Sequence, residues 1–181
     1  FKGKQKEYFD HKSRITIRHL MTHTSGLPPF KKYFLMDNNI QTRLDSVMNT
    51  EPEIGLNQTT IYSDVGLIVL GKVIEFVSKN SLDDFVDSVI FEPLGLKSSF
   101  YNPPNEKNKR VIPTEFSALY GELIKGYVHD ENAKSIGGVA GHAGLFSTAS
   151  DLAIFSQMML NGGIYGWKRI FKSETINDFT K

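Results

Sequence analysis

The chain has 181 residues, of which 40% are hydrophobic and 12% aromatic, so we expect a single globular unit with a sizeable core. Lysine plus arginine (21) nearly balances aspartate plus glutamate (20), which gives no electrostatic reason to expect binding to nucleic acid or to an anionic membrane. The lack of cysteine excludes disulfides, thiolate catalysis and cysteine-based zinc sites, and no apolar run is long enough to predict a membrane span.

The first half of the chain predicts three helices. Thr16 can cap a short helix that runs to about Thr24, with Gly26 in the left-handed turn that follows. Residues 41–49 have the apolar spacing of a modest amphipathic helix. Residues 64–80 are apolar on nearly every face, which predicts a helix buried in the middle of the domain.

The second half alternates between helix signals and a long irregular stretch. Ser81 begins a helix through a capping-box-like pattern, and Pro93 is expected to end it. Residues 98–140 lack a clear period and predict a long, ordered loop region of the kind that often carries function. Thr148 is expected to cap a helix over 149–160, whose predicted inward side chains are Leu152, Phe155, Met158 and Met159. With a last short helix after the loop that follows, the sequence predicts a mainly α structure.

Two histidines spaced four residues apart, His19 and His23, could share a metal ion. A metalloprotease helix would carry glutamate at position 20, which is leucine here, and no third ligand follows at a recognised spacing. The residues therefore favour a helix end, with His23 donating to the last carbonyls and Ser25 serving the turn. A metal hydrolase using His19, His23 and His129 or His142 remains the least favoured hypothesis. We expect that metal analysis of the protein would find no bound metal.

Three further stretches carry reactive side chains. In "IYSDVG", Asp64 could simply be the N-cap of the following helix and Tyr62 a packing residue. The glycine-rich segment 137–152 contains His142 and permits a tight backbone path against a ligand or another part of the chain. The segment "VHDEN", 128–132, is a weak metal-site candidate without geometry but a credible polar wall of a cleft.

The stretches "ITIRHLMTHTSGLP", "IYSDVGLIVLGKVIE" and "GHAGLFSTASDLAIFSQMML" occur in an order that resembles the penicillin-recognising serine hydrolases. This family includes class C β-lactamases, low-molecular-weight penicillin-binding proteins and related esterases. The string "GYVHDENAKSIGGVAGHAGLFS" is similar to a bacterial subgroup of cell-wall metabolism, some members of which are fused to an exo-β-N-acetylglucosaminidase. The resemblance covers nearly the whole chain and implies the helical region of an α+β fold, with most of the sheet missing from these 181 residues.

The resemblance also implies roles for particular residues. Tyr62 would relay the proton of a nucleophilic serine, and Asp64 stands where the family commonly has asparagine. An ionised aspartate can only accept hydrogen bonds, whereas asparagine also donates one to a substrate carbonyl. Efficient β-lactam turnover is therefore not expected. His142, Gly144 and His129 are expected to contact substrate near the mouth of the cleft.

Two motifs of the family are absent from the sequence. None of its serines has a lysine three residues later, and no Lys-Thr-Gly or His-Thr-Gly occurs. We therefore expect a single inactive fragment, residues 1–181, of an extracytoplasmic serine hydrolase (esterase, D-amino-acid peptidase or β-lactamase-like) that uses no cofactor. It would act on a small acyl or peptidoglycan-derived substrate, and an uncovered apolar face could drive self-association. The alternative is a non-catalytic module that binds peptidoglycan or a partner through the 98–147 loops.

Overall fold

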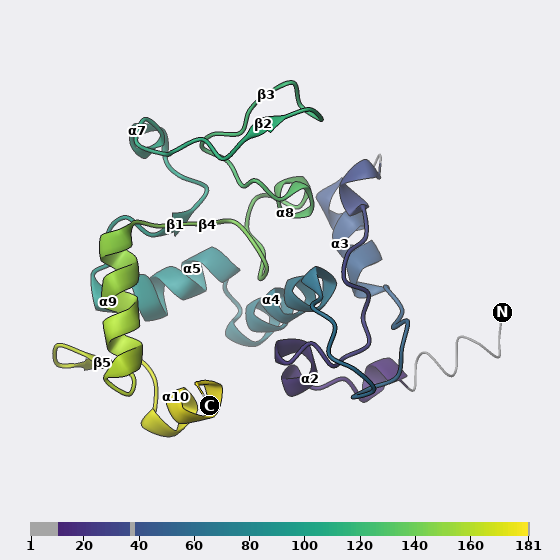
Figure 1. The fold of residues 1–181 in the computed structure, drawn as a ribbon, viewed down its shortest axis with the longest axis horizontal. Helices are drawn as coiled ribbons and strands as arrows, with labels where there is room; N and C mark the ends of the chain where they lie inside the picture. Colours follow the sequence, from purple (N-terminus) through teal and green to yellow (C-terminus); the bar gives the residue numbers. More distant parts are fainter. Residues whose placement is uncertain (1–10, 37–38, 181) are drawn as a thin grey trace.

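The computed structural model describes residues 11–36 and 39–180 and shows a mainly helical chain, as the sequence predicts (Figure 1). Two short helical turns of other types, a 3₁₀ turn (Tyr33–Leu35) and a π-helical turn (Asp87–Phe91), accompany the α-helices. The described α-helices are α2 (Ile17–Met21), α3 (Ile40–Met48), α4 (Asp64–Ser78), α5 (Leu82–Val86), α6 (Glu92–Leu94), α7 (Asn105–Asn108), α8 (Glu131–Ser135), α9 (Ala149–Leu160) and α10 (Ser173–Phe179).

Strand structure in the described part is limited to three antiparallel pairs of two residues each. Phe100 pairs with Phe146 where β1 meets β4, and these rings stack with centroids 6.4 Å apart. The pairs are β1 (Phe100–Tyr101) with β4 (Leu145–Phe146), β2 (Phe116–Ser117) with β3 (Glu122–Leu123), and β5 (Ile164–Tyr165) with β6 (Lys168–Arg169). A larger sheet contributed by other parts of a complete protein stays a proposal.

The helices bury two apolar cores. The first lies among α2, α3, α4 and α8, and the second joins α9 to the helical run 82–94. The first core consists of Leu20, Leu27, Tyr33, Val47, Val65, Ile68, Val128, Ala133, Ile136 and Ala140, and the second of Phe91, Leu94, Leu96 and Met158.

Only the N-terminal half of helix α4 is buried, although its apolar composition predicts burial along the whole helix. Val65 and Ile68 are almost fully buried in its first two turns, but Phe76 and Val77 near its end are 74% and 73% exposed. The expectation of burial on every face is therefore correct for the N-terminal half and wrong for the C-terminal half. An apolar pattern reports which surface could be covered, whereas the cover itself must come from other parts of the fold.

Pro93 does not end its helix, contrary to the sequence prediction. It lies inside α6, directly after the π-helical turn 87–91, and the helical run continues to Leu94. Proline lacks a backbone N–H and disrupts a regular helix from within, but it is accepted in the first turn of a new helical segment. Gly95, in a left-handed conformation with φ 72°, is the residue that ends the run.

Two details of the predicted second half also change. Leu152 was expected to face inward on α9 but is 53% exposed, whereas Met158 on the same helix is fully buried. The region 98–140 is not a plain loop, because it contains β1, α7, β2, β3 and α8. Ile124, Val128 and Ile136 from this region are buried, and apolar burial of this kind holds a segment without a regular period in place.

Asp151 fastens α9 to the start of the 98–140 region. Thr148 caps α9, as predicted, by accepting from the Asp151 backbone N–H at 3.3 Å. The Asp151 carboxylate is buried and accepts from the Ser98 N–H at 2.8 Å and the Ser99 hydroxyl at 2.9 Å. The cap thus joins two segments more than 50 residues apart and positions β4 beside β1.

Candidate functional site

The N-terminus of α4 is held by Ser63 rather than by Asp64. The Ser63 hydroxyl accepts from the Gly66 N–H at 3.0 Å and donates to the Pro28 carbonyl at 2.7 Å, and the side chain is almost fully buried. The interpretation of Asp64 as the N-cap is therefore wrong. Because the cap is filled by its neighbour, the half-buried Asp64 carboxylate remains available for other contacts.

His23 supports the turn that presents Tyr62. Its Nδ1 accepts from the Ser63 backbone N–H at 3.2 Å, and its ring lies 4.7 Å from the ring of Tyr62. The expectation that His23 donates to the end of its helix is met by its backbone N–H, which bonds to the Leu20 carbonyl at 3.3 Å, whereas its ring has no such bond among the described residues. Tyr62 is 61% exposed, and its hydroxyl has no hydrogen bond to a residue that the structure describes. The arrangement holds the ring of Tyr62 against His23 and leaves its side chain exposed.

His19 has a structural role at the start of α2. Its Nδ1 accepts from the Thr16 backbone N–H at 3.1 Å, while the Thr16 hydroxyl accepts from the His19 N–H at 3.3 Å. The other ring nitrogen lies 3.2 Å from the Asn57 side-chain amide. Within residues 11–36 and 39–180, His19 and His23 belong to no group of three or more potential metal ligands. Their rings have separate partners instead, Thr16 and Asn57 for His19 and Ser63 for His23.

A second set of side chains comes together beside Asp64. Ligand atoms of Asp64, Asp130 and His142 all lie within 4.8 Å of one another. The His142 Nε2 lies 2.8 Å from Asp130 Oδ1, and the His142 side chain is only 2% exposed. Each of the three stretches singled out in the sequence, "IYSDVG", "VHDEN" and the glycine-rich segment, therefore contributes one residue to this cluster at the N-terminus of α4.

Asp130 is the functional candidate that the sequence analysis did not select individually. It caps α8 by accepting from the Ala133 N–H at 2.7 Å. Burial raises the pKa of the Asp130 carboxyl, but the hydrogen bonds from His142 and Ala133 outweigh burial and leave the pKa below its usual value. The carboxylate is thus ionised at neutral pH and can only accept, which places the shared proton on Nε2 of His142. In the sequence, Asp130 resembles an ordinary helix N-cap, so nothing marks it as a candidate functional residue.

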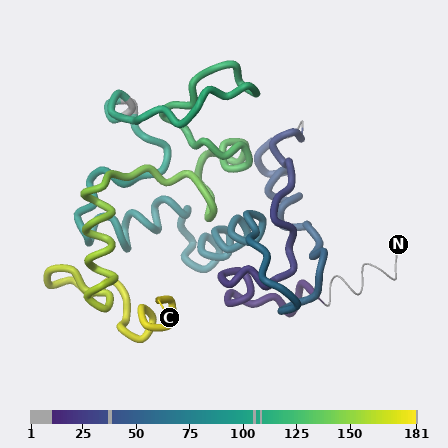
Figure 2. The backbone as a smooth tube through the Cα atoms, in the orientation of Figure 1, coloured from purple at the N-terminus to yellow at the C-terminus, as the bar shows by residue number. Residues whose placement is uncertain are grey.

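The glycine-rich segment brings His142 to this position by crossing α4 at close range (Figure 2). A Cβ on Gly141 would lie 2.1 Å from the Leu67 carbonyl oxygen, and one on Gly71 would lie 3.1 Å from the Gly141 nitrogen. Only glycine permits this crossing, so the expected tight path against another chain segment is confirmed. Gly144 has φ 115°, and a Cβ there would lie 2.3 Å from the Gly138 carbonyl oxygen. The backbone path therefore requires glycine at this position, independently of any contact with substrate.

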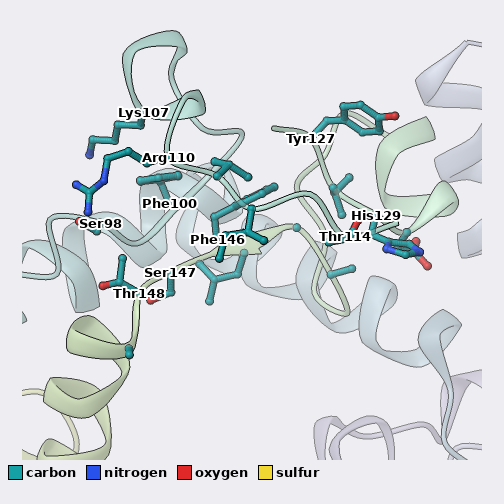
Figure 3. Close-up of a pocket in the computed structure, with 18 of the residues that line it drawn as sticks. Ser98, Phe100, Lys107, Arg110, Thr114, Tyr127, His129, Phe146, Ser147 and Thr148 are labelled. Atoms are coloured by element: carbon teal, nitrogen blue, oxygen red, sulfur yellow. The ribbon is translucent and has the colours of Figure 1, made fainter. Parts of the chain in front are cut away.

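An open hollow of about 1020 Å³ lies on the side of the β1–β4 pair (Figure 3). Gly144 and His129 contribute to its lining, and His129 pairs with Glu115 at 3.1 Å. Lys107 and Arg110 stand at one end and His129 at the other (Figure 3). Tyr62, Asp64 and His142 are not among the lining residues, whereas Asp130 is. The structure therefore separates the predicted site residues into a turn at the start of α4 and a neighbouring hollow, with Asp130 between them.

These features, a tyrosine-bearing turn at the head of a buried helix and a glycine-rich segment crossing that helix, define a chain of the β-lactamase and penicillin-binding class. Residues 6–175 match the family model described as beta-lactamase, and the chain belongs to that family. A Salmonella typhi protein named "Putative D-alanyl-D-alanine carboxypeptidase" is 34% identical over 191 residues, which cover 94% of this chain. The chain spans 44% of the length of that relative.

Solved structures agree on the fold. The β-lactamase/D-alanine carboxypeptidase from Pseudomonas syringae has a TM-score of 0.63 at 22% identity, covering 86% of this chain and 40% of that one. The D-amino acid amidase from Ochrobactrum anthropi SV3 has a TM-score of 0.64 at 23% identity, covering 91% of this chain and 47% of that one. In the part of the chain that the structure describes, no helix combines the length and apolar character needed to cross a bilayer.

Proposed function

We propose that this chain belongs to an extracytoplasmic serine hydrolase that cleaves amide or ester bonds next to D-amino acids in peptidoglycan-derived substrates. The placement of Tyr62 carries the proposal, because its ring rests on His23 and its hydroxyl is exposed and unpaired among the described residues. Membership of the beta-lactamase family and the names of the relatives, a carboxypeptidase and an amidase, support this substrate class.

In the proposed reaction, a serine supplied by the complete protein attacks the acyl carbonyl, and Tyr62 removes the hydroxyl proton as the new C–O bond forms. The same proton passes to the leaving amine or alcohol as the original acyl bond breaks, and water then hydrolyses the acyl-serine. A tyrosine hydroxyl has a pKa of about 10 in isolation, so this role requires cationic groups, such as the lysine of a Ser-x-x-Lys motif, close to the phenol in the complete site.

The test of the relay uses a longer chain that contains a Ser-x-x-Lys segment, incubated with a fluorescent penicillin and a small ester. We expect covalent labelling or ester turnover that falls by roughly 100-fold or more in Tyr62→Phe, the range that general acid–base catalysis supplies. Tyr165→Phe, in the β5–β6 hairpin of the second core, is the matched control and should retain activity. Full activity in Tyr62→Phe would contradict the relay. Absence of labelling and turnover despite an intact Ser-x-x-Lys would favour the alternative, a peptidoglycan- or partner-binding module.

Asp64 gives this proposal a second, independent test. Its carboxylate stands where the family commonly has asparagine, and it has no hydrogen bond within the described residues. Asp64→Asn restores an N–H donor for the amide carbonyl of a β-lactam, so we expect faster penicillin acylation of the complete enzyme. Slower acylation, measured by stopped-flow labelling, would show that a carboxylate at position 64 is itself needed.

The 181-residue chain alone should not react with either probe, because it contains no Ser-x-x-Lys. Covalent labelling of this chain by a fluorescent penicillin or a phosphonate, located by mass spectrometry, would show that a nucleophile of another type is present.

A further inference from the structure

The hollow beside the β1–β4 pair has two polar ends with aromatic side chains between them (Figure 3). Lys107 and Arg110 mark one end and His129 the other. Phe100 and Phe146, whose rings stack, form part of the wall between these ends. The volume of about 1020 Å³ equals that of a sphere about 12 Å across, which is enough for about three extended residues of a peptide.

Arg110 is the cation without a partner at the basic end of the hollow. Its guanidinium forms no ion pair or hydrogen bond with a residue that the structure describes. Lys107 is already engaged, because its ammonium donates to the Lys97 carbonyl at 2.7 Å and lies 4.7 Å from the centroid of the Phe100 ring. A free guanidinium beside a second positive charge favours a carboxylate, which it can bind through two parallel hydrogen bonds.

Glu131 is the corresponding anion towards the opposite end. It follows His129 by two residues and lines the hollow, and its carboxylate has no ion pair or hydrogen bond within the described part of the chain. Lys134, three residues further along α8, does not pair with it. The Lys134 ammonium lies instead over the rings of Tyr120 and Tyr127, 3.6 and 3.8 Å from their centroids. The carboxylate of Glu131 is therefore left for a cation from outside.

We propose that the hollow binds a short dipolar peptide, with a free carboxylate on Arg110 and an ammonium group on Glu131. The part of the peptide between these charges lies against the rings of Phe100 and Phe146. Asp130 also lines the hollow, and its carboxylate adds to the attraction for the ammonium group. A simple anion compensates only Arg110, whereas a dipolar ligand compensates both ends at once, and complementarity of this kind is a source of specificity.

Asp130 connects the hollow to the proposed reaction site. It lines the hollow, and its carboxylate lies within 4.8 Å of that of Asp64 at the start of α4. Tyr62 is outside the lining, so the hollow holds a part of the substrate that does not react, and binding there selects the substrate. This role as a substrate subsite rests on the proposed function, whereas peptide binding itself needs no turnover and can be measured on the 181-residue chain.

The test is calorimetric titration of the 181-residue chain with Nα-acetyl-lysyl-D-alanine, which carries both charges. Its C-terminal amide lacks the carboxylate, and its Nε-acetylated form lacks the ammonium group. We expect the chain to bind the dipolar peptide about 5–10-fold more tightly than either relative. This is less than a buried charged hydrogen bond provides, because Arg110 is exposed. The preference should shrink at high salt, which screens exposed charges.

Two variants identify the two ends of the site. Arg110→Gln should bind the free acid and the amide equally well, and Glu131→Gln should do the same for the free and the acetylated amine. Each variant is compared with itself on two ligands, so a general loss of folding cannot imitate this pattern. Lys109→Gln and Glu106→Gln are the matched controls, because both side chains are exposed charges outside the lining, and they should keep both preferences.

No binding, or equal affinity for the three peptides, would overturn the proposal, and so would an unchanged preference for the free acid in Arg110→Gln. A preference for the carboxylate without one for the ammonium group would show an anion site and would overturn the dipolar ligand. Each of these results leaves the relay test of Tyr62 unaffected, and an inactive complete enzyme leaves the peptide binding standing.

Discussion

Tyr33 shows how one buried hydroxyl couples two parts of the first core. The Thr50 hydroxyl donates to the Ser46 carbonyl at 2.9 Å, so the Tyr33 hydroxyl is the donor in its own bond to Thr50. Burial raises the pKa of Tyr33, the hydrogen bond with Thr50 opposes the rise, and the nearby Glu53 carboxylate adds to it. The neutral phenol is therefore the form that the folded state favours.

We expect Tyr33→Phe to lower the free energy of unfolding by about 1 kcal/mol at neutral pH, because one buried hydrogen bond is lost while Thr50 keeps its bond to Ser46. A raised folded-state pKa means that the parent's contribution is complete below about pH 10 and is lost as the pH rises further, because the unfolded chain ionises first. The difference between the two proteins should therefore shrink above about pH 10. Urea unfolding at neutral and alkaline pH measures both effects, and a constant difference would contradict the assignment.

At the scale of elements, the N-terminus of α4 is the junction on which the site depends. Ser63 connects the helix to the Pro28 carbonyl, and the Ser63 backbone N–H is held by His23. The "HTSG" and "YSD" stretches are thus one local structure, although about 40 residues separate them. The turn that caps the helix also presents Tyr62 and Asp64, the two residues for which a catalytic role is proposed.

Ser63→Ala should cost about 2 kcal/mol, the upper end for a cap, because the change removes a buried cap and leaves the Pro28 carbonyl without its donor. Ser81→Ala is the matched control: Ser81 caps α5 by accepting from the Asp84 N–H at 3.4 Å but is exposed, so we expect about 0.5–1 kcal/mol. Equal losses in urea denaturation would show that the Ser63 bond to Pro28 contributes nothing.

At the scale of the whole molecule, apolar surface remains exposed where α4 ends. Met48, Val73 and Phe76 line a shallow depression between α3 and α4, and Phe76 and Val77 are among the most exposed apolar side chains. The chain spans less than half the length of the relative that it matches. In a complete protein of this family, we propose that further structure covers this surface.

We therefore expect the 181-residue chain to self-associate, because contiguous exposed apolar area favours association in water. Phe76→Ser should reduce the concentration-dependent rise of the sedimentation coefficient. Trp167→Ser, which removes an isolated and fully exposed ring in the turn between β5 and β6, should not. A parent chain that stays monomeric at high concentration would show that this surface is tolerated without a partner.

The sequence alone determined the features that depend on neighbours along the chain. The caps at Thr16, Ser81 and Thr148, the left-handed Gly26 and the mainly helical content follow from local residue preferences and are confirmed. Family membership also follows, since it rests on the order of motifs. The roles of Tyr62, His129, His142 and Gly144 stay predictions.

Only the tertiary structure decided which of these residues meet. His19 and His23 are close in sequence, but His19 bonds to the Thr16 backbone and His23 to the Ser63 backbone. Asp64, Asp130 and His142, by contrast, come together from distant segments. No local pattern encodes that meeting, because it depends on where the glycine-rich segment crosses α4 and on Ser63 filling the cap that Asp64 was expected to fill. Local preferences act over a few residues, but the cluster is created by packing contacts between segments that only the folded chain brings together.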